Sequence, residues 1–212
     1  MSFPAFFAAA PTITVRDPLA QFLGATADGT MTYGYTDAVK LAGHSCPTVA
    51  GAYLMVLRGL AELYGADMPE RGGVEVFLRD ARDEGTTGVV ASVATLLTGA
   101  APETGFGGIG PRFARRHLLH FASPIDGLLA IRRLDTGAGV VLDLDTSTIP
   151  PDPEMGSVFS RAVSGQAGED EQARFAALWQ DRVARILAAP ADDVVRMTAW
   201  HEPAPEPAHE AA

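Results

Sequence analysis

The sequence has very little cysteine: Cys46 is the only one among 212 residues. A single cysteine excludes an intrachain disulfide, a four-cysteine zinc ribbon and a cysteine-bound iron–sulfur cluster. A lone reduced thiol is typical of cytoplasmic proteins, so we expect the chain to be cytoplasmic. A chain of this length buries roughly 70% of its unfolded surface and needs no disulfide or metal simply to stay folded.

Positive charge is also scarce, with 16 Lys and Arg residues against 26 Asp and Glu residues and a formal net charge of −10. A surface with this balance repels nucleic-acid phosphates and anionic lipid headgroups. We therefore expect neither nucleic acid nor a membrane surface to be the main partner.

Long hydrophobic runs and familiar catalytic motifs are missing as well. The N-terminal stretch MSFPAFFAAAPTITVRD is partly apolar, but prolines interrupt it and no basic segment precedes its apolar patch. It predicts neither a signal peptide nor a membrane span. The sequence contains no serine-hydrolase elbow, dinucleotide-binding fingerprint, Walker loop or H-E-x-x-H helix, which removes most enzyme classes that a motif can identify.

The hydrophobic pattern that is present predicts a mixture of helices and strands. The clearest helix spans 47–64, with apolar residues at steps of three or four and Gly65 at its end. Further helices are expected within 17–24, 83–100, 150–163 and 168–189, and strands within 31–35, 73–80, 117–122, 127–134, 139–145 and 194–200.

This pattern predicts an α+β fold, with one mixed domain whose mostly antiparallel sheet is packed by helices. We expect residues 1–30 to form an N-terminal arm, irregular over 1–16, with a short helix capped by Asp17. The main domain would span 31–200. The Pro-, Glu- and Ala-rich residues 201–212 would be a disordered tail.

The stretch LAGHSCPTVAGAYLM, residues 41–55, carries the most distinctive chemistry. His44 and Cys46 are both good zinc ligands, and two residues apart in an extended turn they can converge on one ion. A helix N-terminus also favours an anionic sulfur, so Cys46 is a candidate nucleophile. The alternative is that Cys46 is a small buried hydrophobic residue, as isolated cysteines commonly are.

Three acidic residues, Asp80, Asp83 and Glu84, lie where a predicted strand ends and a helix begins. A carboxylate in this place can complete a metal site or handle a proton, so Asp83 and Glu84 are catalytic candidates. The alternative is that one or more of them only favours the following helix N-terminus.

The loop GFGGIGPRF, residues 105–113, does not match a phosphate-binding loop. Gly107 and Gly108 permit either tight turns or close approach of the backbone to a ligand. Arg112 and Arg115, with Arg116 nearby, form a local basic patch in an acidic protein and are candidates for binding an anionic substrate. A solvated surface is the alternative.

The other histidines are weaker candidates. His117 and His120 lie three apart in a predicted strand and would face opposite sides, so they do not predict a ligand pair. His201 and His209 fall in or beside the predicted tail, where we expect them to be exposed.

The segment DAVKLAGHSCPTVAGAYLMVLRGLAELYG resembles the hallmark of the FmdE family, named for one of the subunits of molybdenum formylmethanofuran dehydrogenase. In that family a Gly-His-x-Cys-Pro stretch opens a long helix, as GHSCP does at 43–47. The resemblance continues through VEVFLRDARDEGTTGVVASVATLLTGA and into the segment from VVLDLDTSTIPPDPEM to a helix containing Leu-Trp. It covers most of residues 35–190.

This resemblance implies an α+β domain that binds a metal, commonly zinc, through His44 and Cys46. The chain departs from the family where further cysteines are usual: it has DARD at 80–83 and GAA at 99–101, and it lacks the zinc-ribbon tail of some members. Other groups would have to complete the metal shell. The resemblance thus indicates a divergent bacterial member, and it does not imply the dehydrogenase machinery itself.

These observations lead to one main functional hypothesis and two alternatives. The main one is a zinc- or other transition-metal-binding protein with a small-molecule pocket and an accessory or carrier role. The first alternative is a metal- or thiol-dependent enzyme acting on a small anionic substrate. The second is non-covalent haem binding through His44 or Cys46. The apolar segment FPAFFAAAP also suggests a homodimer, if a second copy covers it.

Overall fold

The computed structural model describes residues 3–200. Within this range the helices are α1 (Phe6–Ala9), α2 (Pro18–Phe22), α3 (Tyr35–Ala42), α4 (Pro47–Tyr64), α5 (Thr87–Thr98), α6 (Met155–Val163), α7 (Glu169–Ala188) and α8 (Ala191–Val194). The strands are β1 (Ile13–Arg16), β2 (Thr30–Tyr33), β3 (Val74–Leu78), β4 (Leu119–His120), β5 (Leu129–Arg133), β6 (Gly139–Leu144) and β7 (Val195–Trp200).

The strands form two sheets. The larger has the order β4-β3-β5-β6-β7, in which only the short β3–β4 pair is parallel. In its centre Val76 lies opposite Ile131, and Ile131 opposite Val140, so apolar residues line one face. Strands β1 and β2 form a separate antiparallel ribbon.

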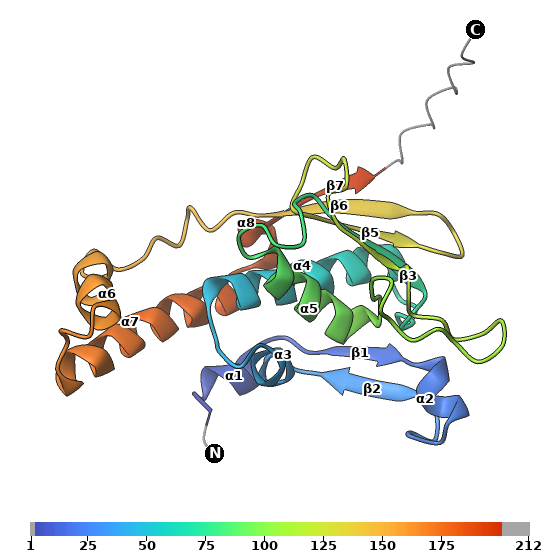
Figure 1. Ribbon diagram of the computed structural model, residues 1–212, viewed down its shortest axis with the longest axis horizontal. Helices are drawn as coiled ribbons and strands as arrows, with labels where there is room; N and C mark the ends of the chain where they lie inside the picture. The colour runs from blue at the N-terminus through green and yellow to red at the C-terminus, as the bar shows by residue number, and fades with distance from the viewer. Residues whose placement is uncertain (1–2, 201–212) are drawn as a thin grey trace, which may run out of the picture.

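The elements are stacked in layers (Figure 1). Helices α4 and α5 lie between the large sheet and a second layer made of β1, β2, α1 and α3. The long helix α7 packs against α4 with one part of its length, and its other part projects from the body with α6 beside it. The turn between α3 and α4 leads into the central helix α4, and its residues Gly43 and His44 are exposed.

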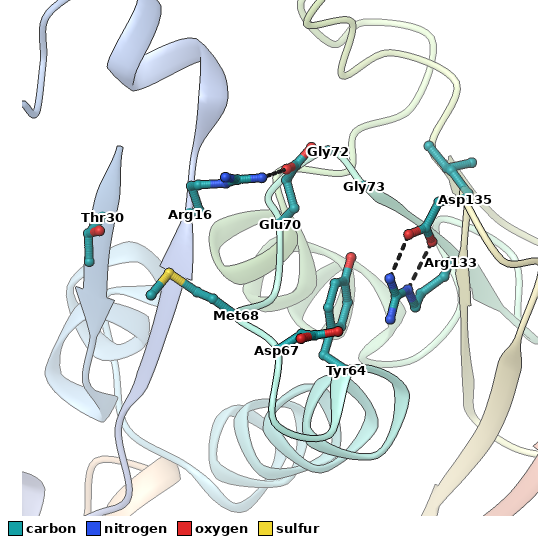
Figure 2. A pocket seen from close by; sticks show the side chains of 11 residues that line it. Arg16, Thr30, Tyr64, Asp67, Met68, Glu70, Gly72, Gly73, Arg133 and Asp135 are labelled. Atoms are coloured by element: carbon teal, nitrogen blue, oxygen red, sulfur yellow. Dashed lines mark hydrogen bonds and ion pairs between the residues drawn. The ribbon is translucent and has the colours of Figure 1, made fainter. Parts of the chain in front are cut away.

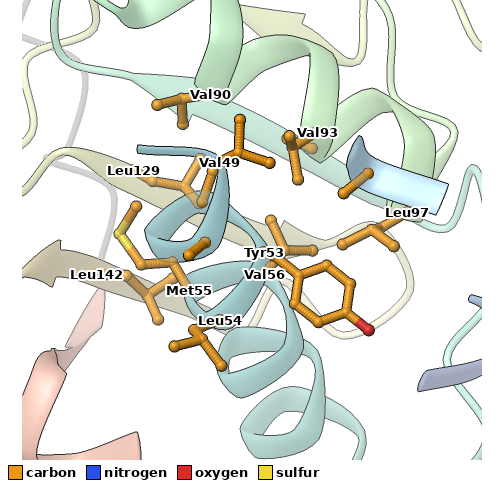
Figure 3. Close-up of a cluster of buried hydrophobic side chains, with 14 of the residues drawn as sticks. Val49, Tyr53, Leu54, Met55, Val56, Val90, Val93, Leu97, Leu129 and Leu142 are labelled. Carbon is orange, nitrogen blue, oxygen red and sulfur yellow. The ribbon is translucent and has the colours of Figure 1, made fainter. Parts of the chain in front are cut away.

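Helix α4 is the centre of the hydrophobic core (Figure 3). Its side chains Val49, Tyr53 and Val56 are fully buried among residues of α5 and the sheet. Two glycines let the helix approach the sheet: a Cβ at Gly59 would lie 2.9 Å from Ile131 Cδ1, and one at Gly51 would overlap the Leu144 side chain. The close approach of helix and sheet fixes the position of the α4 N-terminus.

The α+β prediction is confirmed, with a mixed five-stranded sheet that is antiparallel at all pairs but one. The predicted helix over 47–64 is α4, and Gly65 follows it as the C-cap. The other predicted helices appear with shifted ends, and α3 is a further helix that begins at the end of the predicted strand 31–35.

Two local predictions are wrong. Residues 1–16 are not an irregular arm throughout, because they contain α1 and β1, and β1 pairs with β2 over Ile13–Arg16. The segment 117–122 is not a six-residue strand, because His117 has a φ of 60° and only Leu119–His120 pairs with β3. The disordered tail predicted at 201–212 lies outside the described residues, as do His201 and His209.

The apolar N-terminal segment packs against its own chain. Phe7 is 4% exposed and contacts the ring of Tyr35 edge-on at 5.1 Å between centroids. Phe3 and Phe6 also pack against the main core. Contacts within one chain therefore already explain the apolar residues on which the homodimer prediction was based.

Among the described residues, no helix combines the length and the apolar character needed to cross a membrane.

Candidate functional site

The turn that carries His44 and Cys46 joins α3 to α4. Helix α3 ends at Gly43, which has a φ of 74° and turns the chain sharply. The His44 side chain is exposed, and its Nδ1 lies 2.9 Å from the carbonyl oxygen of Ala42. Because a carbonyl can only accept, Nδ1–H is the donor, and the neutral ring keeps a free lone pair on Nε2.

Cys46 points inward and is 8% exposed. It is the N-cap of α4, and its Sγ accepts a hydrogen bond from the backbone N–H of Val49 at 3.4 Å. Pro47 occupies the first helical position, where its missing N–H costs nothing. The thiol thus caps the first turn of α4.

Ser45, between these two residues, is held by three side chains. Its carbonyl oxygen accepts from Trp179 Nε1 at 3.0 Å and from Gln180 Nε2 at 3.1 Å. Its hydroxyl bonds Gln180 Oε1 at 3.0 Å and lies 2.9 Å from the hydroxyl of Tyr35. Burial raises the pKa of Tyr35 to about 12, so the phenol stays protonated and can donate.

Helices α3 and α7 therefore fix the backbone that presents His44. No local pattern pointed to Tyr35 and Gln180 in this role, because they lie 10 and 135 residues from Ser45. Trp179 was expected only as part of the apolar side of its helix. A preorganised turn of this kind is what a binding or catalytic side chain requires.

A closed zinc centre does not fit this arrangement. In residues 3–200, no group of three or more His, Cys, Asp or Glu side chains could hold a metal ion. A structural zinc site needs four protein ligands and a catalytic one usually three. The Cys46 sulfur, moreover, faces the first turn of its own helix.

The three acidic candidates separate in the structure. Asp80 pairs with Arg79 at 2.9 Å, and the Glu84 carboxylate lies 3.5 Å from the backbone N–H of Ala81. Both line a small hollow at the start of α5. Asp83 instead lines a hollow that also contains His44, although 39 positions separate them in the sequence.

The hollow with His44 and Asp83 belongs to a longer cleft between α3 and α5. One part, of about 420 Å³, contains these two residues. The neighbouring part, of about 430 Å³, is lined mostly by apolar side chains. The two parts share Leu41, Arg82, Gly88 and Ser92. We call the combined hollow the α3–α5 cleft.

The glycine-rich loop does not reach this cleft. Arg115 turns inward and is 7% exposed, with its guanidinium 2.7 Å from Asp17, whereas Arg112 and Arg116 remain exposed. Gly108 has a φ of 94°, and a Cβ there would lie 2.5 Å from the carbonyl oxygen of Arg112. Gly108 therefore serves a tight turn.

Gly107 lies beside the Arg116 side chain, with 3.6 Å between its ideal Cβ and the guanidinium carbon. Neither Gly107 nor Gly108 is among the residues that line the cavity next to Arg112 and Arg115. The loop thus positions Arg112 and Arg115 at this cavity, and Gly107 and Gly108 determine the course of its backbone.

The described histidines other than His44 make no ligand pair. His120 stacks on Phe77 and lies 3.4 Å from Glu75, which Arg132 also binds. His117 is exposed in its turn.

Another hollow, of about 740 Å³, lies between the β1–β2 ribbon and the end of α4 (Figure 2). Its two arginines are already paired: Arg16 with Glu70 at 2.8 Å and Arg133 with Asp135 at 2.5 Å. Both arginines are thus already neutralised, so its size alone does not make it the better candidate site.

A scan of the sequence against protein-family models finds no match, and a search of curated proteins finds none either. The resemblance to the FmdE family therefore stays a prediction from the segments that carry it.

Proposed function

We propose that this protein binds a small molecule in the α3–α5 cleft, with an apolar part along α5 and a polar head at His44. The observation that carries the proposal is that His44 and Asp83, chosen separately from the sequence, line the same hollow. Ligand sites are typically concave and mostly apolar, with a few polar groups that set orientation.

The apolar end of the cleft supports a ligand with a hydrophobic body. Its lining includes Leu41, which is 50% exposed, together with Leu96 and Phe121. An exposed leucine beside an aromatic ring gains free energy when an apolar group covers it.

The polar end supports a head group that donates hydrogen bonds. His44 offers its free Nε2, and Asp83 is an exposed carboxylate. Arg82 contributes positive charge, although Glu103 already binds it at 2.9 Å. An imidazole next to a carboxylate can bind a ligand or exchange a proton with it, so this arrangement serves either a carrier or an enzyme.

Blocking the cleft tests the proposal. The Ser92 side chain is exposed and lines both parts of the cleft, so Ser92→Trp should fill it. In a ligand-detected NMR screen of small aromatic amines such as benzylamine, whose ammonium group can donate to His44 Nε2 and pair with Asp83, we expect hits on the native protein to disappear in this variant. His44→Ala should weaken them roughly 10-fold, the value of one charge-assisted hydrogen bond.

Ser160→Trp is the matched control. Ser160 is also an exposed helical serine whose hydroxyl donates to the carbonyl four residues before it, as that of Ser92 does. Hits that survive Ser92→Trp, or that Ser160→Trp removes equally, would contradict the cleft as the binding site.

A transition metal at His44 is the second candidate function, supported by the free Nε2 and the resemblance to the FmdE family. Because the described residues do not make a closed centre, we propose that water or the ligand would supply the remaining positions. Elemental analysis of tag-free protein should then find about one zinc or other transition metal per chain, lost in His44→Ala.

The absorption spectrum of the same sample tests the haem alternative, since bound haem would give a Soret band. Metal that persists in both His44→Ala and Cys46→Ser would contradict this assignment. Protein without metal or chromophore would do so too, and would leave the cleft as a site without a cofactor.

A further inference from the structure

A second charged cluster lies around Asp17 at the start of α2, next to the apolar part of the α3–α5 cleft, with which it shares Arg71. Its carboxylate accepts from Arg71 at 2.6 Å and from Arg115 at 2.7 Å, as well as from the backbone N–H groups of Leu19 and Ala20. Asp17 is 4% exposed and Arg115 7% exposed. Two guanidinium groups thus share one buried carboxylate.

The Arg115 side chain is more than nine-tenths buried and incompletely bonded. Its Nη1 has no hydrogen-bond partner among the described residues, and neither does Nε of Arg71. The Arg115 guanidinium lies against Gly72, where a Cβ would overlap Nη1. Burial lowers the pKa of Arg115, and the neighbouring Arg71 lowers it further, while Asp17 raises it.

A cavity of about 270 Å³ opens at this cluster, and Arg71, Gly72, Arg112 and Arg115 all line it. Glu70 lines it too, but its carboxylate is bound by Arg16 at 2.8 Å. Asp17 is then the only nearby carboxylate of the described residues that is left to balance three arginines.

The exposed side of the cavity combines positive charge with aromatic rings. The Arg112 guanidinium lies 4.4 Å from the centre of the Phe113 ring and 6.0 Å from that of Phe22. Phe22 is 57% exposed. Phe113 has a φ of 66°, a conformation that costs a bulky residue free energy and is concentrated at functional sites.

We propose that this cavity, which we call the arginine cavity, binds the dianionic phosphate group of a small phosphate monoester. Arg71, Arg112 and Arg115 would contact the phosphate, and Phe22 and Phe113 would cover the organic part. The excess of two positive charges over Asp17 matches the charge of a phosphate monoester near neutral pH better than that of a carboxylate.

The cavity is smaller than the range of about 300–1,000 Å³ typical of whole-ligand pockets, so it suits a head group rather than a large molecule. The chain as a whole has a net charge of −10, so three arginines at one cavity depart from its general charge balance and point to an anionic ligand. Of the residues that line this cavity, Arg71 also lines the apolar part of the α3–α5 cleft, whereas none lines the part that contains His44.

Calorimetric titration with inorganic phosphate, phenyl phosphate and benzoate, at constant ionic strength set with chloride, tests the proposal. The native protein should bind one phenyl phosphate per chain, more tightly than phosphate and far more tightly than benzoate. Arg112→Ala should weaken phenyl phosphate roughly 10- to 100-fold, because one charge-assisted contact is lost. Arg112 is exposed, so the variant should keep the native thermal midpoint in the absence of ligand.

Arg116→Ala is the matched control, since Arg116 is an exposed arginine of the same loop that does not line the cavity. It should change the affinity by no more than about twofold, the size expected of an exposed charge. Benzoate binding as tightly as phenyl phosphate, equal losses in the two variants, or no phosphate binding at millimolar concentration would each overturn the proposal. Ser92→Trp should leave phenyl phosphate binding intact, which separates this site from the cleft.

Discussion

Asp17→Asn should destabilise the protein by roughly 3–5 kcal/mol, the usual cost of removing one partner from a buried ion pair. The reason is the shared carboxylate: Arg71 and Arg115 would lose the counter-charge that both of them bind, while Arg115 is 7% exposed. The asparagine amide would also place a donor where the native group accepts. Urea unfolding followed by circular dichroism measures the loss.

Asp135→Asn provides the comparison, because Asp135 also binds an arginine but its side chain is 62% exposed. Its unfolding midpoint should not change measurably, as is usual for exposed ion pairs. Replacing both partners, as in Asp17→Asn combined with Arg115→Met, should be less harmful than the two single losses added together. A small effect of Asp17→Asn alone would mean that the cluster is solvated rather than buried.

Gly72→Ala should destabilise the protein by about 2–5 kcal/mol for two separate reasons. Gly72 has a φ of 81°, which costs an L-residue about 1–2 kcal/mol. The added methyl would also overlap Arg115 Nη1 and lie 2.7 Å from its Cζ, so the buried guanidinium would have to move. Such overpacking typically costs a further 1–3 kcal/mol or so. Thermal and urea unfolding both measure this loss.

Gly137→Ala isolates the backbone contribution. Gly137 has a φ of 72°, close to that of Gly72, but nothing lies within 4 Å of its ideal Cβ. It should show only the cost of the left-handed conformation, about 1–2 kcal/mol. Equal losses at the two glycines would mean that Arg115 moves aside freely and is not held against Gly72. Gly72→Ala should also weaken phenyl phosphate binding, since it displaces an arginine of the arginine cavity.

Local sequence signals were sufficient for most of the elements. The helix 47–64 was predictable because its apolar spacing, Pro47 at its start and Gly65 at its end agree with one another. The short helix after Asp17 was predictable for the same kind of reason, since the Asp17 side chain accepts from two N–H groups of its first turn. Such signals involve only a few neighbouring residues, so the helix ends can be predicted from them without the rest of the chain.

The 117–122 prediction failed because an apolar pattern does not reveal whether a partner strand is available. His117 adopts a φ of 60°, and Leu119 and His120 alone pair with β3 at the sheet edge. Residues 13–16 form a strand only because Thr30–Tyr33 lies beside them. Strand pairing is a tertiary property, and short strands depend on it entirely.

The sequence by itself identified the turn 43–47, the acidic cluster 80–84 and the basic loop 112–116 as places for chemistry, since each depends on residue type and close spacing. Only the tertiary structure brought His44 and Asp83 to one hollow and turned Arg115 inward to Asp17. Asp17 and Arg115 are 98 residues apart. Their meeting results from the packing of α4 and α5 between the two sheets, which brings distant segments together for reasons that no local pattern records.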